Sequence, residues 1–217
     1  MDMGDIPAIY TSSDSMGTIR IKKYTLCYIH SEKMSQVDGV ERKSDNIFTD
    51  KMKPKYNKIK NNFVQTPTEV TNQLLQLEAF MGNVLEPCCG NGAISEILIE
   101  KGFNVKSSDL FDYGYGEVRD LFDINEMYDN VITNPPFSLN IDMIEKLLSI
   151  TKNKLALLWY VKNIGNIIES RRSKGLKTIY VFNQRIQWKE TKIGWLFAWY
   201  VWEKEYNGNI IIKRIDI

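Results

Sequence analysis

The chain has 217 residues and a formal net charge of +1, and hydrophobic residues make up 43% of it. This length and composition allow one α/β domain with an appendage, or two small domains, with enough apolar residues for a sizeable core. No apolar run reaches the roughly 18 residues that a membrane span needs, and the start MDMGDIPAIY lacks the basic region and apolar stretch of a secretory signal. We therefore expect a cytoplasmic protein without a membrane partner.

Cysteine and histidine are scarce: the cysteines are Cys27, Cys88 and Cys89, and the single histidine is His30. Adjacent cysteines rarely form a disulfide and the third would stay unpaired, which favours a reducing compartment. A zinc site needs about four ligands at set spacings. We therefore expect no metal site, and a zinc deaminase is disfavoured because its histidine–glutamate and paired-cysteine signature is missing.

The charge is unevenly distributed along the chain. Residues 63–150 contain 4 Lys/Arg and 14 Asp/Glu, whereas residues 151–217 contain 13 Lys/Arg and 5 Asp/Glu. An acidic middle beside a basic last third indicates two faces with different partners, unless these charges are only solvated.

The first 62 residues are polar and only weakly periodic. GTIRIKKYTLCYI (17–29) alternates in polarity and predicts a strand or hairpin. KMKPKYNKIK (51–60) contains five lysines and is typical of a solvated connector or of an arm that contacts phosphates. We predict a partly disordered N-terminal extension over residues 1–62 and a folded domain over residues 63–217.

The sequence TPTE predicts the start of a helix. Thr66 is placed to be the N-cap, Pro67 to be the first helical residue and Glu69 to reach back to the cap. Apolar residues then recur on one helical face as far as Met81, and Gly82 is expected to end the helix.

Strands and helices alternate after this helix. Strands are predicted at 83–89, 104–110, 129–134, 154–161, 177–183, 194–204 and 209–216, and helices at 93–102, from after 137 to about 151, and at 163–175. Strands separated by helices form parallel β-α-β units, whereas the last strands have no helix between them and should pair antiparallel. The expected fold class is therefore α/β, with a doubly wound, mostly parallel sheet and an antiparallel finish.

The loop EPCCGNGA joins the first of these strands to its helix. Gly90 and Gly92 permit positive φ angles and a close approach of a ligand to the backbone, and the helix start offers free N–H groups. The loop lacks the Gly-Lys-Ser/Thr of a P-loop, and a dinucleotide loop would have a third glycine where Ser95 stands. Because Glu86 would repel a pyrophosphate, the loop suits a cofactor with an ammonium or sulfonium group.

Two further carboxylates are placed to complete a nucleoside pocket. Asp109 ends the second strand, where a carboxylate can accept two ribose hydroxyls; the alternative is a helix N-cap or a turn. Asp120 is placed to hold an adenine amino group, and Asp123 is its rival.

The sequence TNPPF follows a predicted buried strand and precedes a helix. Asn134 is extended because it precedes a proline, and Pro135 and Pro136 supply no N–H donors. The corner thus presents acceptors, the Asn134 side-chain oxygen and the Pro135 carbonyl, to an exocyclic amine. These acceptors would stabilise the positive charge that the nitrogen gains when it attacks a methyl group, and Phe137 offers a ring on which a base can stack. A rigid turn would explain the prolines but not the flanking Asn and Phe so economically.

NPPF (134–137) resembles the catalytic motif of S-adenosylmethionine-dependent amino methyltransferases, chiefly DNA adenine-N6 methyltransferases. EPCCGNGA resembles their cofactor loop, with Glu86 where Asp is commoner, and FVQTP (63–67) is similar to the cofactor segment that precedes it. The later strands are similar to those of small phage and prophage adenine methyltransferases. The resemblance covers roughly residues 63–217 and implies a Rossmann-like class I methyltransferase fold. It also implies that the protein acts in the cytoplasm of a bacterial or phage-infected cell.

The resemblance implies S-adenosyl-L-methionine as the cofactor and a flipped adenine in DNA as the substrate. The residues that it implies for cofactor binding are Phe63, Thr66, Pro67, Glu86, Pro87, Cys88, Gly90, Gly92, Asp109 and Asp120. The residues that it implies for holding the target amine and base are Asn134, Pro135, Pro136 and Phe137.

Restriction-type enzymes with this motif order carry a long target-recognition region after the catalytic motif, whereas we expect only one stretch between Phe137 and Ile217 to be long and basic enough to reach a groove. The basic stretch NQRIQWKETKIG is expected to serve instead, with Arg185, Trp188, Lys189 and Lys192 in contact with DNA. For Trp188, burial as a strand aromatic is an equal alternative.

Other substrates and roles stay open. RNA adenine is the alternative substrate, although no separate RNA-binding module is recognisable. Protein glutamine comes third, because the basic last third of the chain favours a nucleic acid. An inactive nucleic-acid-binding module is disfavoured by the intact NPPF sequence.

Overall fold

The computed structural model describes residues 19–21, 24–26, 63–136, 141–168, 173–188 and 194–217. The chain divides into two units, Met1–Lys53 and Pro54–Ile217. In the first unit, β1 (Ile19–Ile21) pairs antiparallel with β2 (Tyr24–Leu26). This pairing agrees with the predicted hairpin, whereas the lysine-rich stretch 51–60 lies outside the described residues.

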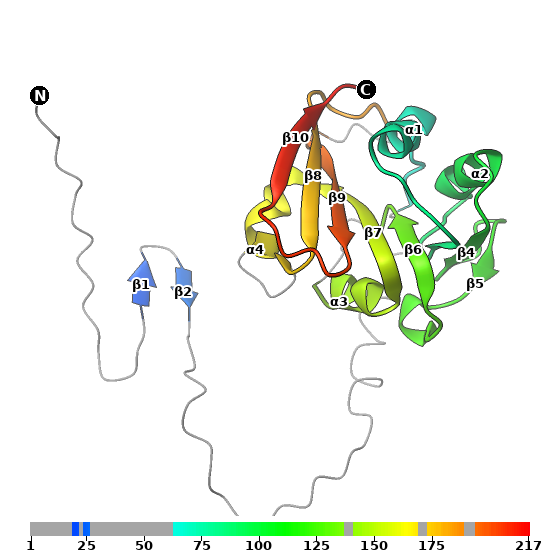
Figure 1. Cartoon of the computed structure of the whole chain (residues 1–217), viewed down its shortest axis with the longest axis horizontal. Helices are drawn as coiled ribbons and strands as arrows, with labels where there is room; N and C mark the ends of the chain where they lie inside the picture. The colour runs from blue at the N-terminus through cyan, green and yellow to red at the C-terminus, as the bar shows by residue number, and fades with distance from the viewer. Residues whose placement is uncertain (1–18, 22–23, 27–62, 137–140, 169–172, 189–193) are drawn as a thin grey trace, which may run out of the picture. The chain divides into compact units, whose positions relative to one another are not determined.

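The second unit is built on one eight-stranded sheet with the order β10-β8-β9-β7-β6-β3-β4-β5 (Figure 1). Its strands are β3 (Val84–Glu86), β4 (Val105–Asp109), β5 (Glu117–Val118), β6 (Tyr128–Thr133), β7 (Thr151–Tyr160), β8 (Leu176–Phe182), β9 (Phe197–Glu203) and β10 (Ile211–Ile215). Every neighbouring pair is parallel except the two that involve β9. The doubly wound, mostly parallel sheet is thus confirmed, with β5 as a short strand that the sequence pattern did not predict.

The antiparallel finish is correct for β9 and wrong for β10. β9 is inserted between β7 and β8 and runs antiparallel to both. Because both edges of β9 are then hydrogen-bonded, β10 cannot pair with it and takes the remaining edge of β8, to which it is parallel.

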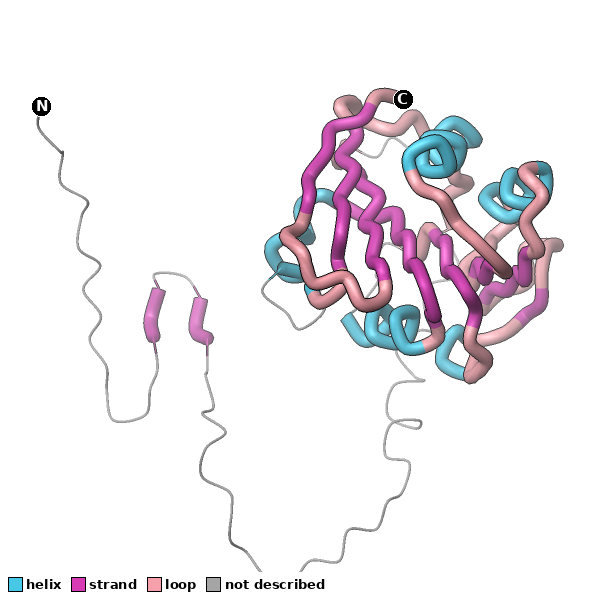
Figure 2. Tube along the Cα trace, in the orientation of Figure 1, coloured by secondary structure: helices cyan, strands magenta, loops and turns pink. Residues whose placement is uncertain are grey.

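The helices flank the sheet (Figure 2) and are α1 (Thr68–Leu77), α2 (Ala93–Glu100), α3 (Ile141–Ser149) and α4 (Ile164–Ile168). The crossover from β3 to β4 steps in one direction along the sheet, and the crossover from β6 to β7 steps in the other. Right-handed crossovers therefore place α2 and α3 on opposite faces. Within the predicted helix 163–175, a 3₁₀ turn (Val161–Asn163) leads into α4, residues 169–172 lie outside the described residues, and residues 174–175 form a turn.

The predicted capping box before α1 is not formed. Pro67 is the N-cap, no side chain caps the helix, and the helix begins at Thr68. The helix also ends at Leu77, before the predicted Gly82, because Glu78 is extended. The Glu78 carboxylate accepts hydrogen bonds from Lys154 at 2.6 Å and from Tyr180 at 2.7 Å, and these contacts join the end of the helix to β7 and β8.

The core is richest around β7 and β9, where Trp199, Tyr200 and Trp202 are fully buried. Trp199 Nε1 donates to the Val70 carbonyl at 3.0 Å and so fastens α1 to the sheet. The strand order reverses between β3 and β6, so a crevice opens where the carboxyl ends of these two strands lie side by side. Among the described segments, none of the helices has the length and apolar character that a bilayer span requires.

Candidate functional site

A cavity lies at this switch point, and six segments of the chain line it. Ten of the residues predicted from the sequence line it: Phe63, Thr66, Glu86, Pro87, Cys88, Asp109, Asp120, Asn134, Pro135 and Pro136. The structure therefore brings the predicted cofactor residues and the Asn-Pro-Pro corner into one cavity. Apolar and aromatic side chains that were not predicted complete its wall, among them Leu110, Phe111, Tyr113, Leu121 and Phe122. Their position directly after Asp109 and Asp120 is the sequence signal that could have found them.

Three of the predicted cofactor residues do not line the cavity, and Phe137 lies outside the described residues. Pro67 is the N-cap of α1. Gly90 and Gly92 have the positive φ angles expected of them, +52° and +87°. A Cβ at Gly90 would come within 2.0 Å of the Phe63 ring, and one at Gly92 within 2.5 Å of the Tyr115 ring. In this structure the close approach that these glycines allow is therefore made by aromatic side chains of the protein.

Glu86 ends β3 and is 1% exposed. The Ser95 hydroxyl of α2 donates a hydrogen bond to Glu86 Oε2 and lies 2.6 Å from the Ser107 hydroxyl of β4. Burial raises the pKa of Glu86 to about 8, although the hydrogen bonds from Ser95 oppose this shift. Ser95, at the position where a dinucleotide loop would carry a glycine, thus hydrogen-bonds the buried Glu86 carboxyl group.

Asp109 ends β4 and holds the glycine loop in place. Its Oδ2 accepts from the Gly90 N–H at 2.9 Å, and its Oδ1 accepts from the Phe111 N–H at 3.1 Å. Burial raises the pKa of Asp109, against the effect of these backbone hydrogen bonds. The turn contact, which the sequence offered as the alternative to a ribose contact, is therefore present, and Asp109 also lines the cavity.

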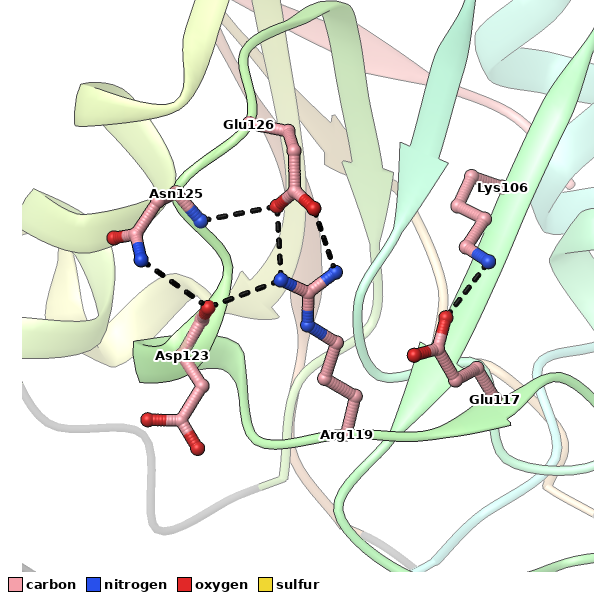
Figure 3. A network of polar contacts seen from close by, with 6 residues as sticks. All are labelled: Lys106, Glu117, Arg119, Asp123, Asn125 and Glu126. Atoms are coloured by element: carbon pink, nitrogen blue, oxygen red, sulfur yellow. Dashed lines mark hydrogen bonds and ion pairs between the residues drawn. The ribbon is translucent and has the colours of Figure 1, made fainter.

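The two rival carboxylates, Asp120 and Asp123, have different surroundings. Asp120 lines the cavity, and its Oδ1 accepts from the Phe122 N–H at 2.9 Å. Asp123 is exposed, and its backbone carbonyl accepts from Arg119, which also forms a two-pronged ion pair with Glu126 (Figure 3). Because Asp123 does not line the cavity, Asp120 is the better candidate for an adenine contact.

The side chain of Asn134 is held by one hydrogen bond. Its Nδ2 donates to Thr66 Oγ1 at 3.0 Å, and Thr66 is buried. Its Oδ1 is also buried and has no hydrogen-bond partner among the described residues. The carboxamide is thus oriented with its nitrogen engaged and its oxygen available as an acceptor. The sequence did not predict this role for Thr66.

Cys88 and Cys89 line the cavity as neutral thiols. Burial raises the pKa of the Cys88 thiol above its ordinary value and that of the Cys89 thiol to about 12. A thiol rather than a thiolate therefore faces the cavity, and thiols are weak nucleophiles. In the part of the chain that the structure describes, no three His, Cys, Asp or Glu side chains are grouped as metal ligands.

The predicted DNA-contacting residues are only partly described. Arg185 is exposed on the loop after β8. Trp188 is 7% exposed and packs against Phe197, with ring centroids 4.8 Å apart, so it is buried as the alternative expected, although it lies in the connection after β8 and not in a strand. Lys189 and Lys192 lie outside the described residues.

Comparisons with known proteins identify the fold. No protein-family model and no curated protein sequence matches this chain. A candidate RNA methyltransferase from Pyrococcus horikoshii has 18% identity and a TM-score of 0.55, over 65% of this chain and 86% of that chain. The modification subunit of a candidate type I restriction enzyme from Vibrio vulnificus has 12% identity and a TM-score of 0.53, over 74% of this chain and 49% of that chain.

A further likeness is to the tRNA (uracil-54, C5)-methyltransferase of Pyrococcus abyssi, solved with S-adenosyl-L-homocysteine, with 16% identity and a TM-score of 0.50. The match covers 65% of this chain and 40% of that chain, so this chain spans less than half the length of this protein and of the modification subunit. At these identities the likenesses establish the architecture. The second unit therefore has the Rossmann-like fold of class I methyltransferases.

Proposed function

We propose that this protein transfers a methyl group from S-adenosyl-L-methionine to the exocyclic amino group of adenine in DNA, after the base has left the duplex. The observation that carries the proposal is the Asn134 side-chain oxygen. It is a buried acceptor without a described partner, in the wall of a cavity that it shares with Glu86 and Asp109.

The cavity wall suits a cationic nucleoside. Three acidic residues, Glu86, Asp109 and Asp120, line it, and no Lys, Arg or His does so among the described residues. Burial disfavours the ionised forms of Glu86 and Asp109, so a ligand with a positive charge would stabilise these carboxylates, whereas a pyrophosphate would disfavour them further.

S-adenosyl-L-methionine fits this wall and would supply an electrophilic methyl group on a sulfonium centre. Asp109 would accept hydrogen bonds from the ribose hydroxyls, and Asp120 would accept one from the adenine amino group. The apolar side chains that follow these two carboxylates, such as Phe111 and Phe122, would cover the adenine ring.

The Asn-Pro-Pro corner would act on the target amine. The Asn134 oxygen can accept an N–H of the amine, and Pro135 has no N–H that would compete for it. The nitrogen becomes more positive as it forms the new bond, so this acceptor stabilises the transition state more than the ground state. Thr66 Oγ1 accepts from Nδ2, so in the structure the carboxamide nitrogen faces Thr66 and its oxygen is left for the amine.

The substrate is tested with labelled S-adenosyl-L-methionine. The protein is incubated separately with duplex DNA, RNA and bulk protein, and the labelled product is digested and identified. We expect label in DNA, as N6-methyladenine, and no label with Asn134→Ala. RNA is the alternative candidate for the substrate, because the similar solved structures include proteins named as RNA methyltransferases as well as a restriction-modification subunit. Label confined to RNA or to protein would contradict the proposal for DNA.

A further inference from the structure

A second hollow lies beyond the end of β7, and its most prominent side chain is Trp195. It is lined by residues 161–162, 183–185 and 194–196, and we call it the Trp195 groove. Trp195 is 53% exposed, whereas the other four tryptophans of the chain are each 7% exposed or less. An indole left this open at the rim of a hollow is available to a partner.

Basic side chains accompany this indole. The Lys162 ammonium lies 4.1 Å from the centroid of the Trp195 ring and 4.9 Å from that of the Tyr160 ring. Arg185 is exposed and lines the same groove, while no Asp or Glu does so among the described residues. The groove therefore combines an aromatic face with two positive charges.

The Trp195 groove and the Asn-Pro-Pro corner lie at the same edge of the sheet. Thr133, at the end of β6, pairs with Leu157 of β7, so the carboxyl ends of these parallel strands point the same way. The Val161 N–H, directly after β7, donates to the Leu196 carbonyl at 3.0 Å and fixes the residue next to Trp195 at this edge. A polymer that enters the cavity at Asn134 would run along this edge.

We propose that the Trp195 groove binds the strand that carries the target adenine, with a neighbouring base of that strand unpaired and stacked on Trp195 and its phosphates near Lys162 and Arg185. The inference rests on the proposed function, to which it adds a binding surface. An aromatic face beside basic side chains is the combination that single-stranded nucleic acids select, because every base can stack and every nucleotide carries a phosphate. A protein partner would need a larger apolar patch than Trp195 and Leu196 provide.

Tryptophan fluorescence tests this inference, because Trp195 is the exposed indole. We would titrate the cofactor-free protein with a short single-stranded DNA oligonucleotide that contains one adenine. Stacking should quench the emission of the wild-type protein and of Asn134→Ala. Trp195→Phe, which keeps a ring and the fold, should bind the oligonucleotide but show no quenching.

Affinity measurements by fluorescence anisotropy complete the test. Trp195→Ala should weaken oligonucleotide binding about five- to a hundredfold, the range that base–aromatic stacking spans. Lys162→Gln and Arg185→Gln should each flatten the log–log salt dependence by about 0.7 for each phosphate that the variant no longer neutralises. Lys204→Gln is the matched control, because Lys204 is exposed and follows β9 at the opposite edge of the sheet.

The outcomes separate this inference from the proposed function, since binding is measured without methyl transfer. Unchanged affinity in Trp195→Ala together with persistent quenching in Trp195→Phe would overturn the inference even if DNA is methylated. A wild-type protein that is a dimer in sedimentation, and becomes a monomer with Trp195→Ala without loss of DNA binding, would also overturn it, because the groove would then join two copies. Quenching that disappears with Trp195→Phe, in a protein that methylates no DNA, would leave the groove in place and contradict the proposed function.

Discussion

The Asn134 side-chain amide donates a hydrogen bond to Thr66 Oγ1 at 3.0 Å, across 68 positions of the sequence. Thr66 belongs to the segment that leads into α1, and Asn134 follows β6. Both residues line the same cavity. The segment proposed to contact the cofactor therefore also orients the side chain proposed to receive the target amine.

Thr66→Val should lower kcat about three- to tenfold, because the carboxamide loses a hydrogen bond of about 1 kcal/mol and can rotate. Thr66→Ser keeps an acceptor oxygen and should restore most of the activity. The measurement is kcat at saturating cofactor and DNA, beside the cofactor Kd from calorimetry. A Thr66→Val variant with unchanged kcat and weakened cofactor binding would show that Thr66 serves the cofactor alone.

Asp109→Ala should weaken cofactor binding by about tenfold or more, because the variant loses the acceptor proposed for the ribose hydroxyls. Asp109 also holds the Gly90 and Phe111 N–H groups, so the loop itself could shift in this variant. Asp109→Asn is the control, since its amide oxygen can still accept from one N–H group. Calorimetry should show that the Asp109→Asn variant binds the cofactor more weakly than the wild-type protein and more tightly than Asp109→Ala. Equal affinities in all three proteins would contradict the ribose assignment.

The affinity for S-adenosyl-L-methionine should rise with pH as far as about pH 8. The pKa of Glu86 is raised from 4.5 to about 8, so the ligand-free protein holds this carboxyl group protonated at neutral pH. A sulfonium ligand favours the carboxylate, and its binding therefore releases a proton. The affinity for S-adenosyl-L-homocysteine, which lacks the sulfonium charge, should depend less on pH. In Glu86→Gln, the affinity for S-adenosyl-L-methionine should lose the pH dependence that comes from Glu86.

The same carboxyl group makes the ligand-free protein less stable as the pH rises. Between pH 4.5 and about 8 the folded state binds a proton at Glu86 that the unfolded state has released, so the free energy of unfolding falls as the pH increases through this window. Thermal unfolding at several pH values measures this effect. In Glu86→Gln the free energy of unfolding should depend less on pH than in the wild-type protein. If the two proteins show the same pH dependence, the pKa of Glu86 is not raised in the folded state.

The sequence predicted the residues that end strands better than the contacts between distant side chains. Glu86, Asp109 and Asn134 each stand at or directly after the end of a predicted strand, and the carboxyl ends of parallel strands meet at one edge. The hydrogen bonds of Thr66 with Asn134 and of Ser95 with Glu86 depend on how α1 and α2 pack, which no local pattern encodes.

The exposure of the tryptophans could not be predicted from the local sequence either. Trp188 and Trp195 both lie in the connection between β8 and β9, and the sequence offered no sign that the first would be buried and the second exposed. Trp188 packs on Phe197, whereas Trp195 lies beside Lys162. The position of β10 could not be predicted either, because it depends on β9 having both edges occupied.

The rate of methyl transfer in Asn134→Ala tests the central claim most directly. The measurement is a single turnover with labelled S-adenosyl-L-methionine and adenine-containing duplex DNA, with cofactor affinity determined in parallel. We predict that the rate falls by orders of magnitude while the cofactor Kd changes little, because the missing acceptor acts on the target amine in the transition state. A variant that methylates DNA at nearly the wild-type rate would contradict the account.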